Sequence, residues 1–409
     1  MRKFRFSTFQ EVAKFAAGRP LVLWGGGNIA AKTLRKLGRP IDLLIDNNPN
    51  LIGTEQLGVT VSGPNALASL AGKPYILICT TSFLEVSEQL AGLGHDPEAD
   101  FLVSPVLNDL RIIAEMETLQ TRLLFTSGLP PLDDPRCGGG LYELVLDGDT
   151  WDYRKVHSGN CHGLIERGGH FFVVDDELGL LELDREYRIV RSGVLPKGLR
   201  AHGLSHSEAN GCFYVTCSYA DKVIELDADF QPLREFPLSH KHARDGEPHH
   251  HCNDCLVVGD SLYVSMFSLT GNWKRNVFDG AVLEFDLVTG EKLGPVIGDL
   301  WMPHNIALID GSLTVLDSLR GRLLKNNAQN IGEFPGFARG LAHDGAHFYV
   351  GQSRNRNYSS YLGLSKNISI DTAIIVFDEY TKVSRSLHLP SRLSEIHSIL
   401  ALRATTHQE

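Results

Sequence analysis

Six segments of this chain repeat one short pattern, and the repetition limits the fold more than any other feature. Each segment begins with a polar residue and continues with a small or polar residue and an apolar one. The six starting residues are His162, His202, Asn253, His304, Arg339 and His397. Successive starts lie 35 to 58 residues apart. Repeats of this length made of short strands are typical of β-propellers.

Apolar runs with strand character follow most of the starts. Phe171-Phe-Val-Val and Leu181-Glu-Leu-Asp are examples of the second and third strands of a repeat. The repeat that begins near Leu123 lacks a first strand of its own, and Ile396-His-Ser-Ile at the other end of the chain supplies it. We therefore predict a six-bladed propeller over residues 123–403, closed by the C-terminal strand, because closure removes exposed sheet edges.

Residues 1–105 alternate apolar strands with helical segments, which predicts an α/β Rossmann-like domain with a parallel sheet. Residues 106–122 have helical periodicity and are predicted to link the domains. Within the first domain, Gly25, Gly27 and Ala30 fit the pattern G-x-G-x-x-A between a strand and a helix. Such glycines, with Asn28 at the helix start and Asp46 as a ribose-binding acid, favour NAD(P) or a nucleotide-sugar. The alternative is a glycine turn needed only for packing.

The segment from Leu21 through Asp46-Asn-Asn-Pro to Gly58-Val-Thr-Val resembles a small Rossmann-like domain of bacterial sugar acyltransferases and polysaccharide-biosynthesis proteins. The resemblance implies that this domain binds a nucleotide-sugar or serves as a regulatory or docking module.

In a propeller, the six repeat starts converge on one axis. Imidazoles that meet at short range suit a divalent transition metal such as Fe, Zn or Mn. We therefore predict a metal site whose ligands are His162, His202, His304 and His397, with His251 as a fifth. The alternative is that each histidine caps its strand or binds water in the channel.

Around this axis, the sequence predicts a site for an anionic, sugar-like substrate. Arg339 would bind a carboxylate or phosphate, and Asp317 or Asp254 would act as general base. Solvated loops and blade-edge packing are the alternatives for the remaining candidates. Those are Asn253, Arg320 and Arg354 for substrate binding, and Trp273 with Tyr358 and Tyr361 for sugar stacking.

The later repeats resemble a family of uncharacterised bacterial six-bladed propellers. Matching segments include His251-Cys-Asn-Asp, Met302-Pro-His-Asn and Phe334-Pro-Gly-Phe-Ala-Arg-Gly. The resemblance implies the propeller fold and no particular reaction.

Composition narrows the class of function. The net charge of −10 argues against nucleic-acid partners and anionic membranes, and no apolar run reaches the roughly 18 residues of a membrane span. Seven scattered cysteines do not form a disulfide framework, so we expect a cytoplasmic protein, with homo-oligomers left open. Our first hypothesis is a metal-dependent lyase, hydrolase or isomerase. Its rival is a non-catalytic ligand- or protein-binding propeller with a Rossmann sensor or docking domain.

Overall fold

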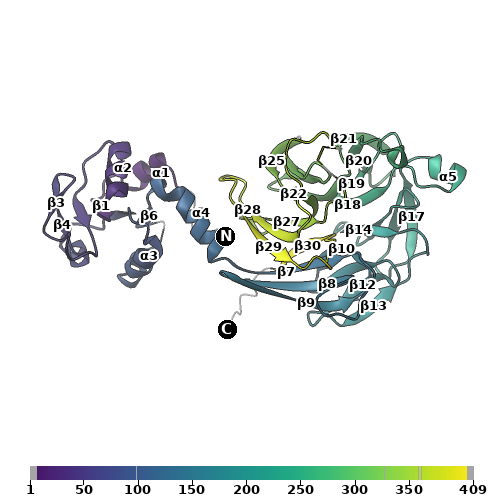
Figure 1. Cartoon of the computed structure of the whole chain (residues 1–409), viewed down its shortest axis with the longest axis horizontal. Helices are drawn as coiled ribbons and strands as arrows, with labels where there is room; N and C mark the ends of the chain where they lie inside the picture. Colours follow the sequence, from purple (N-terminus) through teal and green to yellow (C-terminus); the bar gives the residue numbers. More distant parts are fainter. Residues whose placement is uncertain (1–6, 98, 327, 358, 361, 403–409) are drawn as a thin grey trace. The chain divides into compact units, whose positions relative to one another are not determined.

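The computed structural model describes residues 7–97, 99–326, 328–357, 359–360 and 362–402 (Figure 1). The chain divides into two compact units, Met1–Glu117 and Thr118–Glu409. The predicted linker helix, α4 (Asn108–Glu117), groups with the first unit. Among the described residues, no helix combines the length and the apolar character needed to cross a membrane.

The first unit is an α/β sheet of strand order β3-β4-β2-β1-β5-β6, parallel except for the β3–β4 pair. Leu21 and Leu23 of β1 pack toward α1 and α2, whereas Val22 and Trp24 pack toward α3. Successive strand residues face opposite sides, so helices cover both faces of this sheet. The strands are β1 (Leu21–Trp24), β2 (Leu43–Ile45), β3 (Glu55–Gln56), β4 (Val59–Ser62), β5 (Tyr75–Ile78) and β6 (Phe101–Val103). The helices besides α4 are α1 (Phe9–Phe15), α2 (Asn28–Leu37), α3 (Phe83–Gly92) and the 3₁₀ turns η1 (Pro64–Ser69) and η2 (Pro105–Leu107).

The second unit is a six-bladed β-propeller, as the repeats predict. Each blade is a four-stranded antiparallel sheet. Five blades are formed in chain order: β10 (Cys161–Arg167), β11 (His170–Asp175), β12 (Gly179–Leu183), β13 (Ile189–Gly193); β14 (Ala201–His206), β15 (Phe213–Cys217), β16 (Lys222–Leu226), β17 (Pro232–Pro237); β18 (Cys252–Val258), β19 (Ser261–Met266), β20 (Gly280–Asp286), β21 (Lys292–Leu300); β22 (His304–Ile309), β23 (Ser312–Asp317), β24 (Arg322–Lys325), β25 (Gln329–Glu333); β26 (Phe337–His343), β27 (Phe348–Ser353), β28 (Thr372–Phe377), β29 (Ser384–Leu389).

The sixth blade joins the two ends of the propeller sequence. Its innermost strand β30 (Ile399–Leu402) pairs antiparallel with β7 (Gln120–Ser127), and β8 (Gly140–Asp147) and β9 (Thr150–Ser158) complete the sheet. The predicted closure by the C-terminal strand is therefore confirmed.

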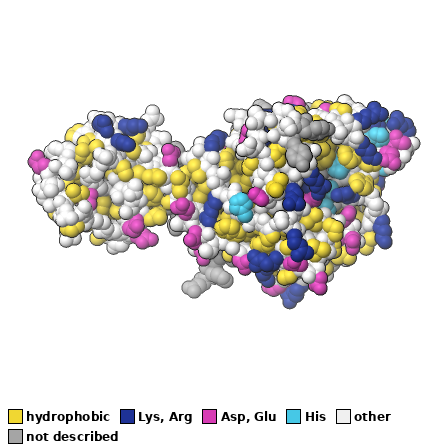
Figure 2. Space-filling view, in the orientation of Figure 1, with side chains coloured by type: hydrophobic (Ala, Val, Ile, Leu, Met, Phe, Trp, Pro, Cys, Tyr) yellow, Lys and Arg dark blue, Asp and Glu magenta, His cyan; other side chains and the backbone are white. Residues whose placement is uncertain are grey.

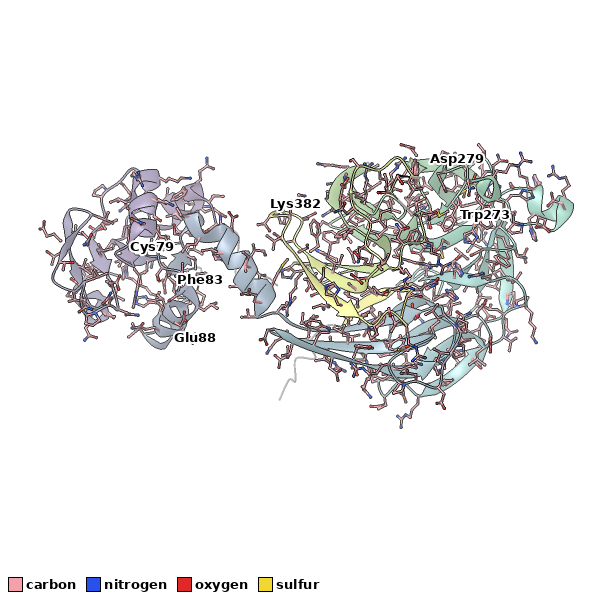
Figure 3. The ribbon with its side chains drawn as sticks, in the orientation of Figure 1. Cys79, Phe83, Glu88, Trp273, Asp279 and Lys382 are labelled. Atoms are coloured by element: carbon pink, nitrogen blue, oxygen red, sulfur yellow. The ribbon has the colours of Figure 1, made fainter. Side chains whose placement is uncertain are left out.

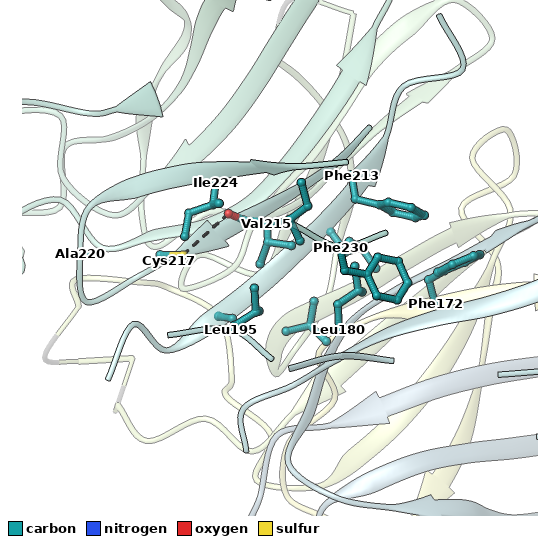
Figure 4. Packing of buried hydrophobic residues seen from close by; sticks show 13 residues of the cluster. Phe172, Leu180, Leu195, Phe213, Val215, Cys217, Ala220, Ile224 and Phe230 are labelled. Carbon is teal, nitrogen blue, oxygen red and sulfur yellow. Dashed lines mark hydrogen bonds between the residues drawn. The ribbon is translucent and has the colours of Figure 1, made fainter. Parts of the chain in front are cut away.

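Apolar side chains fill the space between neighbouring blades. In Figure 4, Phe172 and Leu180 of one blade pack against Phe213 and Val215 of the next, with Phe230 beside them. Burial of large apolar side chains between neighbouring blades keeps the inner strands in fixed positions around the axis.

A β-bulge in the inner strands explains why the repeat motif points inward. The pairing register shifts in all five blades formed in chain order, for example between Cys161 and Leu164 and between Ala201 and Leu204. The bulge leaves the residues inside the motif, such as His162 and Gly163, out of the ladder, and a bulge re-aims side chains.

Glycine in the motif allows neighbouring inner strands to approach. A Cβ on Gly163 would lie 2.6 Å from the His202 carbonyl oxygen, and one on Gly203 would lie 2.5 Å from the Asp254 Cα. Side chains cannot occupy these positions, so the glycines set the width of the axis.

Two long loops lie beside the third blade. Residues 238–251 carry α5 (Lys241–Asp245), over which Figure 2 shows basic, acidic and histidine side chains gathered. Residues 267–279 carry η3 (Trp273–Arg275), and Figure 3 labels Trp273 and Asp279 in this loop. The Trp273 indole N–H donates to the Pro248 carbonyl at 3.2 Å, which joins the two loops.

Candidate functional site

The structure brings three of the predicted histidines into ring contact. The ring centroid of His162 lies 4.4 Å from that of His202 and 4.3 Å from that of His397. His162 Nδ1 is 3.0 Å from His397 Nδ1. All three side chains are buried. They come from β10, from β14 and from two residues before β30, so residues far apart in sequence meet at the axis.

His304 and His251 extend this group on one side. The His304 ring lies 5.2 Å from Phe267, whose ring lies 4.3 Å from His251. His304 Nδ1 lies 2.9 Å from the Met302 carbonyl oxygen. The same Nδ1 lies 2.8 Å from the Ser318 hydroxyl oxygen. The carbonyl accepts only and the hydroxyl can accept, so a hydrogen on Nδ1 satisfies both contacts and leaves the lone pair on Nε2.

An aspartate from the second blade positions His251. The Asp221 carboxylate accepts the backbone N–H groups of His249, His250 and His251, the last at 2.8 Å. His251 adopts a φ of 53° there, in the left-handed region. The ring of His251 then lies 4.7 Å from Trp273 and 6.0 Å from His202, between the loops and the axis.

Burial keeps the axial imidazoles neutral. Desolvation, followed by the nearby Arg339, lowers the pKa of His162 to about 3, and desolvation with Arg200 lowers that of His251 to about 3. Desolvation also lowers the pKa of His202, His304 and His397, followed by His162 for His202 and by Arg339 for the other two. A neutral imidazole retains a lone pair that can bind a metal ion or accept a proton.

Two ring nitrogens of this group have no hydrogen-bond partner among the described residues. They are His162 Nε2 and His251 Nδ1, and the Nε of Arg339 shares this state. A buried polar atom without a partner costs about 1–3 kcal/mol. These atoms therefore have the capacity to bind a ligand.

Positive charge outweighs negative charge at the axis. Arg339 lies 3.5 Å from Glu395, which also pairs with Arg356 and lies 3.3 Å from His397 Nε2. Arg200 donates from Nε to His202 Nε2 at 3.3 Å. Burial and the neighbouring arginines lower the pKa of Arg339 to about 9, so this group remains a cation at neutral pH.

The sequence reasoning missed Arg200 and Glu395, although a positional signal exists. Both lie two residues before a motif start, the position that His251 occupies before Asn253. Met302 and Phe337 hold the equivalent positions, and both contact His304. The residues two before five of the six starts thus lie next to the axial group or at equivalent positions.

A cavity of about 430 Å³ lies among the loops around Tyr219, Glu247 and Trp273, and no axial histidine or arginine of the described chain lines it. Its lining includes Trp273, which contacts His251, and Tyr219, whose hydroxyl accepts from Arg200 at 2.8 Å. Lys274 and Glu247 pair at the rim. This volume suits a small molecule, and both Trp273 and Tyr219 connect its wall to the histidines.

The two predicted general bases lie in different surroundings. Asp254 follows Asn253 in the bulge and accepts the Ile306 N–H of the next blade at 2.9 Å. Burial raises the pKa of Asp254 to about 7. Asp317 ends β23, accepts the Trp301 N–H at 2.7 Å and pairs with Arg320 at 3.1 Å, and burial raises its pKa to about 6.

The remaining substrate-binding candidates are only partly at the axis. The Asn253 amide lies 3.3 Å from His202 Nδ1. Arg320 is engaged by Asp317 and Asp299, and Arg354 is exposed in the loop after β27. Tyr358 and Tyr361 lie outside the described residues.

In the α/β unit, Gly25 approaches the end of β5. A Cβ there would lie 2.7 Å from the Cys79 carbonyl oxygen, and the φ of Gly25 is 117°. Gly27 caps α2, which begins at Asn28, and a Cβ on Gly27 would meet open space. The Asp46 carboxylate accepts the Gly26 N–H at 2.7 Å and the Asn48 N–H at 2.8 Å.

A second cluster of metal-ligating side chains lies near the motif of β10. Within the described ranges, His157, Cys161 and Asp175 form the one group of three or more His, Cys, Asp or Glu whose ligand atoms all lie within 4.8 Å. The axial histidines do not form such a group. Desolvation and Asp175 raise the pKa of Cys161 well above its usual range, so the thiol is not an activated nucleophile.

Comparisons with known proteins cover mainly the propeller. Residues 182–409, more than half of the chain, match the model of a domain of unknown function (DUF4915). A search of curated proteins finds no match.

Several solved structures are similar in fold. A chain of a nidogen/laminin complex is 11% identical with a TM-score of 0.49, and the match covers 69% of this chain and 98% of that one. A protein of unknown function from Bacteroides caccae is 15% identical with a TM-score of 0.48, covering 70% and 100%. Inactive virginiamycin B lyase from Staphylococcus aureus is 12% identical with a TM-score of 0.36, covering 64% and 84%. These likenesses concern the fold and carry nothing about activity.

Proposed function

We propose that the propeller of this chain, which belongs to the DUF4915 family, is a metal-dependent enzyme that acts on a small anionic molecule at the axial histidines. One observation carries the proposal: three buried, neutral imidazoles meet at the axis, with two ring nitrogens 3.0 Å apart. Imidazole is the commonest protein ligand of divalent transition metals.

Imidazole nitrogens are suitable donors for a divalent ion. His162, His202 and His397 would hold it after their side chains rotate, because their ligand atoms do not all lie within 4.8 Å of one another and His202 Nε2 accepts from Arg200. The nitrogens of His162 and His251 that have no partner among the described residues are free to bind it. A bound ion of Fe, Zn or Mn would polarise a carbonyl or phosphoryl oxygen of the substrate.

The surrounding charge supports an anionic substrate. Arg339 and Arg200 contact the axial group, whereas Glu395 is the carboxylate that contacts it and is already shared by Arg339 and Arg356. A guanidinium binds carboxylate and phosphate through paired hydrogen bonds. The substrate would approach the axis from the 430 Å³ cavity, whose wall includes Trp273 and Tyr219, the residues that contact His251 and Arg200.

Proton transfer falls to His304. Its Nδ1 hydrogen is held by the Met302 carbonyl, which fixes Nε2 as the proton acceptor. Asp317 orients the Trp301 backbone in this proposal, since Arg320 and the Trp301 N–H already engage its carboxylate. Lyase, isomerase and hydrolase reactions can each use such a base next to an oxygen held by a cation.

The test compares two double variants of the full chain purified without a histidine tag. His202→Asn/His397→Asn removes two axial ligands, and His240→Asn/His388→Asn removes two exposed histidines as a control. We expect the native chain and the control to bind Mn²⁺, Fe²⁺ or Zn²⁺ at the axis and to convert a member of a panel of sugar acids and sugar phosphates, followed by NMR. The axial variant should lose both properties. Equal metal content and equal turnover in both variants would contradict the proposal, and anion binding without turnover would favour the non-catalytic binding protein.

A further inference from the structure

The search for a site beyond the axis leads to His157, Cys161 and Asp175. His157 lies near the end of β9, the outermost strand of the blade closed by β30. Cys161 begins β10 and Asp175 ends β11, and the two are cross-strand partners. The three side chains therefore connect the closing blade to the blade that follows it.

We propose that His157, Cys161 and Asp175 bind a zinc ion that fastens β9 to β10 and β11. The inference is independent of the axial site, because it uses none of the axial histidines.

The distances between ligand atoms match tetrahedral zinc. Bonds of about 2.0 Å to nitrogen and oxygen and about 2.3 Å to sulfur place N and O about 3.3 Å apart and S and O about 3.5 Å apart. In the structure, His157 Nε2 lies 3.6 Å and Cys161 Sγ lies 3.8 Å from Asp175 Oδ2. Shifts of a few tenths of an ångström would bring both atoms to the zinc spacing from Asp175 Oδ2, and the ligand atoms of His157 and Cys161 lie within 4.8 Å of each other.

Neighbouring backbone groups orient the side chains that would bind the ion. Asp175 Oδ1 accepts the N–H groups of Glu177 and Leu178 at 2.9 and 3.0 Å, which leaves Oδ2 directed at His157 and Cys161. His157 Nε2 is buried and makes no hydrogen bond within the described chain. Residue 159 must be glycine, because a Cβ there would lie 1.9 Å from Asp175 Oδ2.

The charges balance in this buried place. One thiolate, one carboxylate and a neutral imidazole neutralise Zn²⁺, and the Cys161 proton leaves to solvent when the ion binds. Thiolate with imidazole and carboxylate is a donor set that zinc prefers. The His157 side chain is 12% exposed, so water can reach the fourth position.

Cobalt substitution of the full chain tests the site. We expect Co²⁺ to give a thiolate-to-cobalt charge-transfer absorption in the near ultraviolet, because a sulfur ligand is present. The absorption should disappear in Cys161→Ser and persist in Cys217→Ser, a control at another buried free cysteine. It should also persist in His202→Asn/His397→Asn, which separates this site from the axial one.

Zinc content gives the second readout. We expect zinc affinity to fall at least about tenfold in Cys161→Ser and in Asp175→Asn, whose amide oxygen still accepts the Glu177 and Leu178 N–H groups. Should both variants fail to fold, the cobalt spectrum of the native chain decides alone. A native chain without the thiolate absorption, or a folded Cys161→Ser chain with native zinc affinity, would overturn the proposal.

Discussion

The glycine motif of the α/β unit and the histidine motif of the propeller use their polar groups in opposite ways. Asp46 accepts the N–H groups of Gly26 and Asn48, so the fold itself satisfies the carboxylate of the first motif. In the second motif, His162 and the neighbouring His251 keep ring nitrogens without partners in the described structure. Polar groups that the fold satisfies hold the fold together, and buried groups that it leaves unsatisfied are available to a ligand.

The largest expected loss of unfolding free energy distinguishes a glycine of the propeller motif from a glycine of the α/β motif. Gly203→Ala places a Cβ 2.5 Å from the Asp254 Cα, so we expect the propeller to lose about 3 kcal/mol of unfolding free energy. Gly27→Ala, whose Cβ would meet open space, should leave the α/β unit nearly unchanged. Urea unfolding followed separately for each unit measures both. Gly298→Ala is the control within the propeller, and equal stability of the Gly203 and Gly298 variants would contradict the close approach of the inner strands.

The buried carboxylate of Asp100 gives the α/β unit a predicted pH dependence of stability. Burial alone would raise the pKa of Asp100, but Lys73 at 2.6 Å, the Asp96 N–H and Arg19 at 2.9 Å lower it to about 2. Its folded-state pKa lies below the unfolded value of 3.8, so its stabilisation is present above about pH 3.8 and is lost as pH falls toward about 2. Asp100→Asn should cost about 2 kcal/mol at neutral pH and less than about 0.5 kcal/mol at pH 2, measured by urea unfolding of the α/β unit. A constant loss at every pH would exclude the ion pairs as the cause.

Asp254 should give the opposite pH dependence in the propeller. Burial raises its pKa to about 7, so the folded state binds more protons than the unfolded state between about pH 3.8 and 7. Stability from this group therefore falls as pH rises through that window, by about 2 kcal/mol between about pH 5 and pH 7. Asp254→Asn cannot ionise, and its unfolding free energy should lack this decline. Parallel curves for native and variant would show that Asp254 is already ionised at pH 5.

The smallest effect concerns the expected nucleotide in the α/β unit, which stays a prediction. NAD(P) or a nucleotide-sugar at ten times its Kd should stabilise the chain by about 1.4 kcal/mol. Asp46→Asn should remove the shift if Asp46 binds ribose. A thermal-shift screen measures this, with Asp42→Asn as the control, since Asp42 accepts the Leu21 N–H at the opposite end of β1. A native chain that responds to no nucleotide would leave the Gly25 loop with a packing role alone.

Sequence repetition predicted the propeller because the motif recurs once per blade and the missing strand could be located near Ile396. It also predicted which histidines approach the axis. It did not predict Arg200 and Glu395, since their role depends on the backbone turn before each inner strand, where Arg200 and His251 adopt left-handed φ values. The cluster of Cys161 and Asp175 was missed because a cross-strand pair depends on register, which a motif read along one strand does not contain.

Closure by β30 has a consequence for how the protein is made. A ribosome produces the five inner strands β10, β14, β18, β22 and β26 before it reaches Glu395 and His397. These two residues join the axis when the strand that follows them pairs with β7, with Ile399 opposite Phe125. A nascent chain interrupted before this strand would carry most of the blades but no finished centre. The proposed axial site would therefore form only after the last strand of the ring has been made.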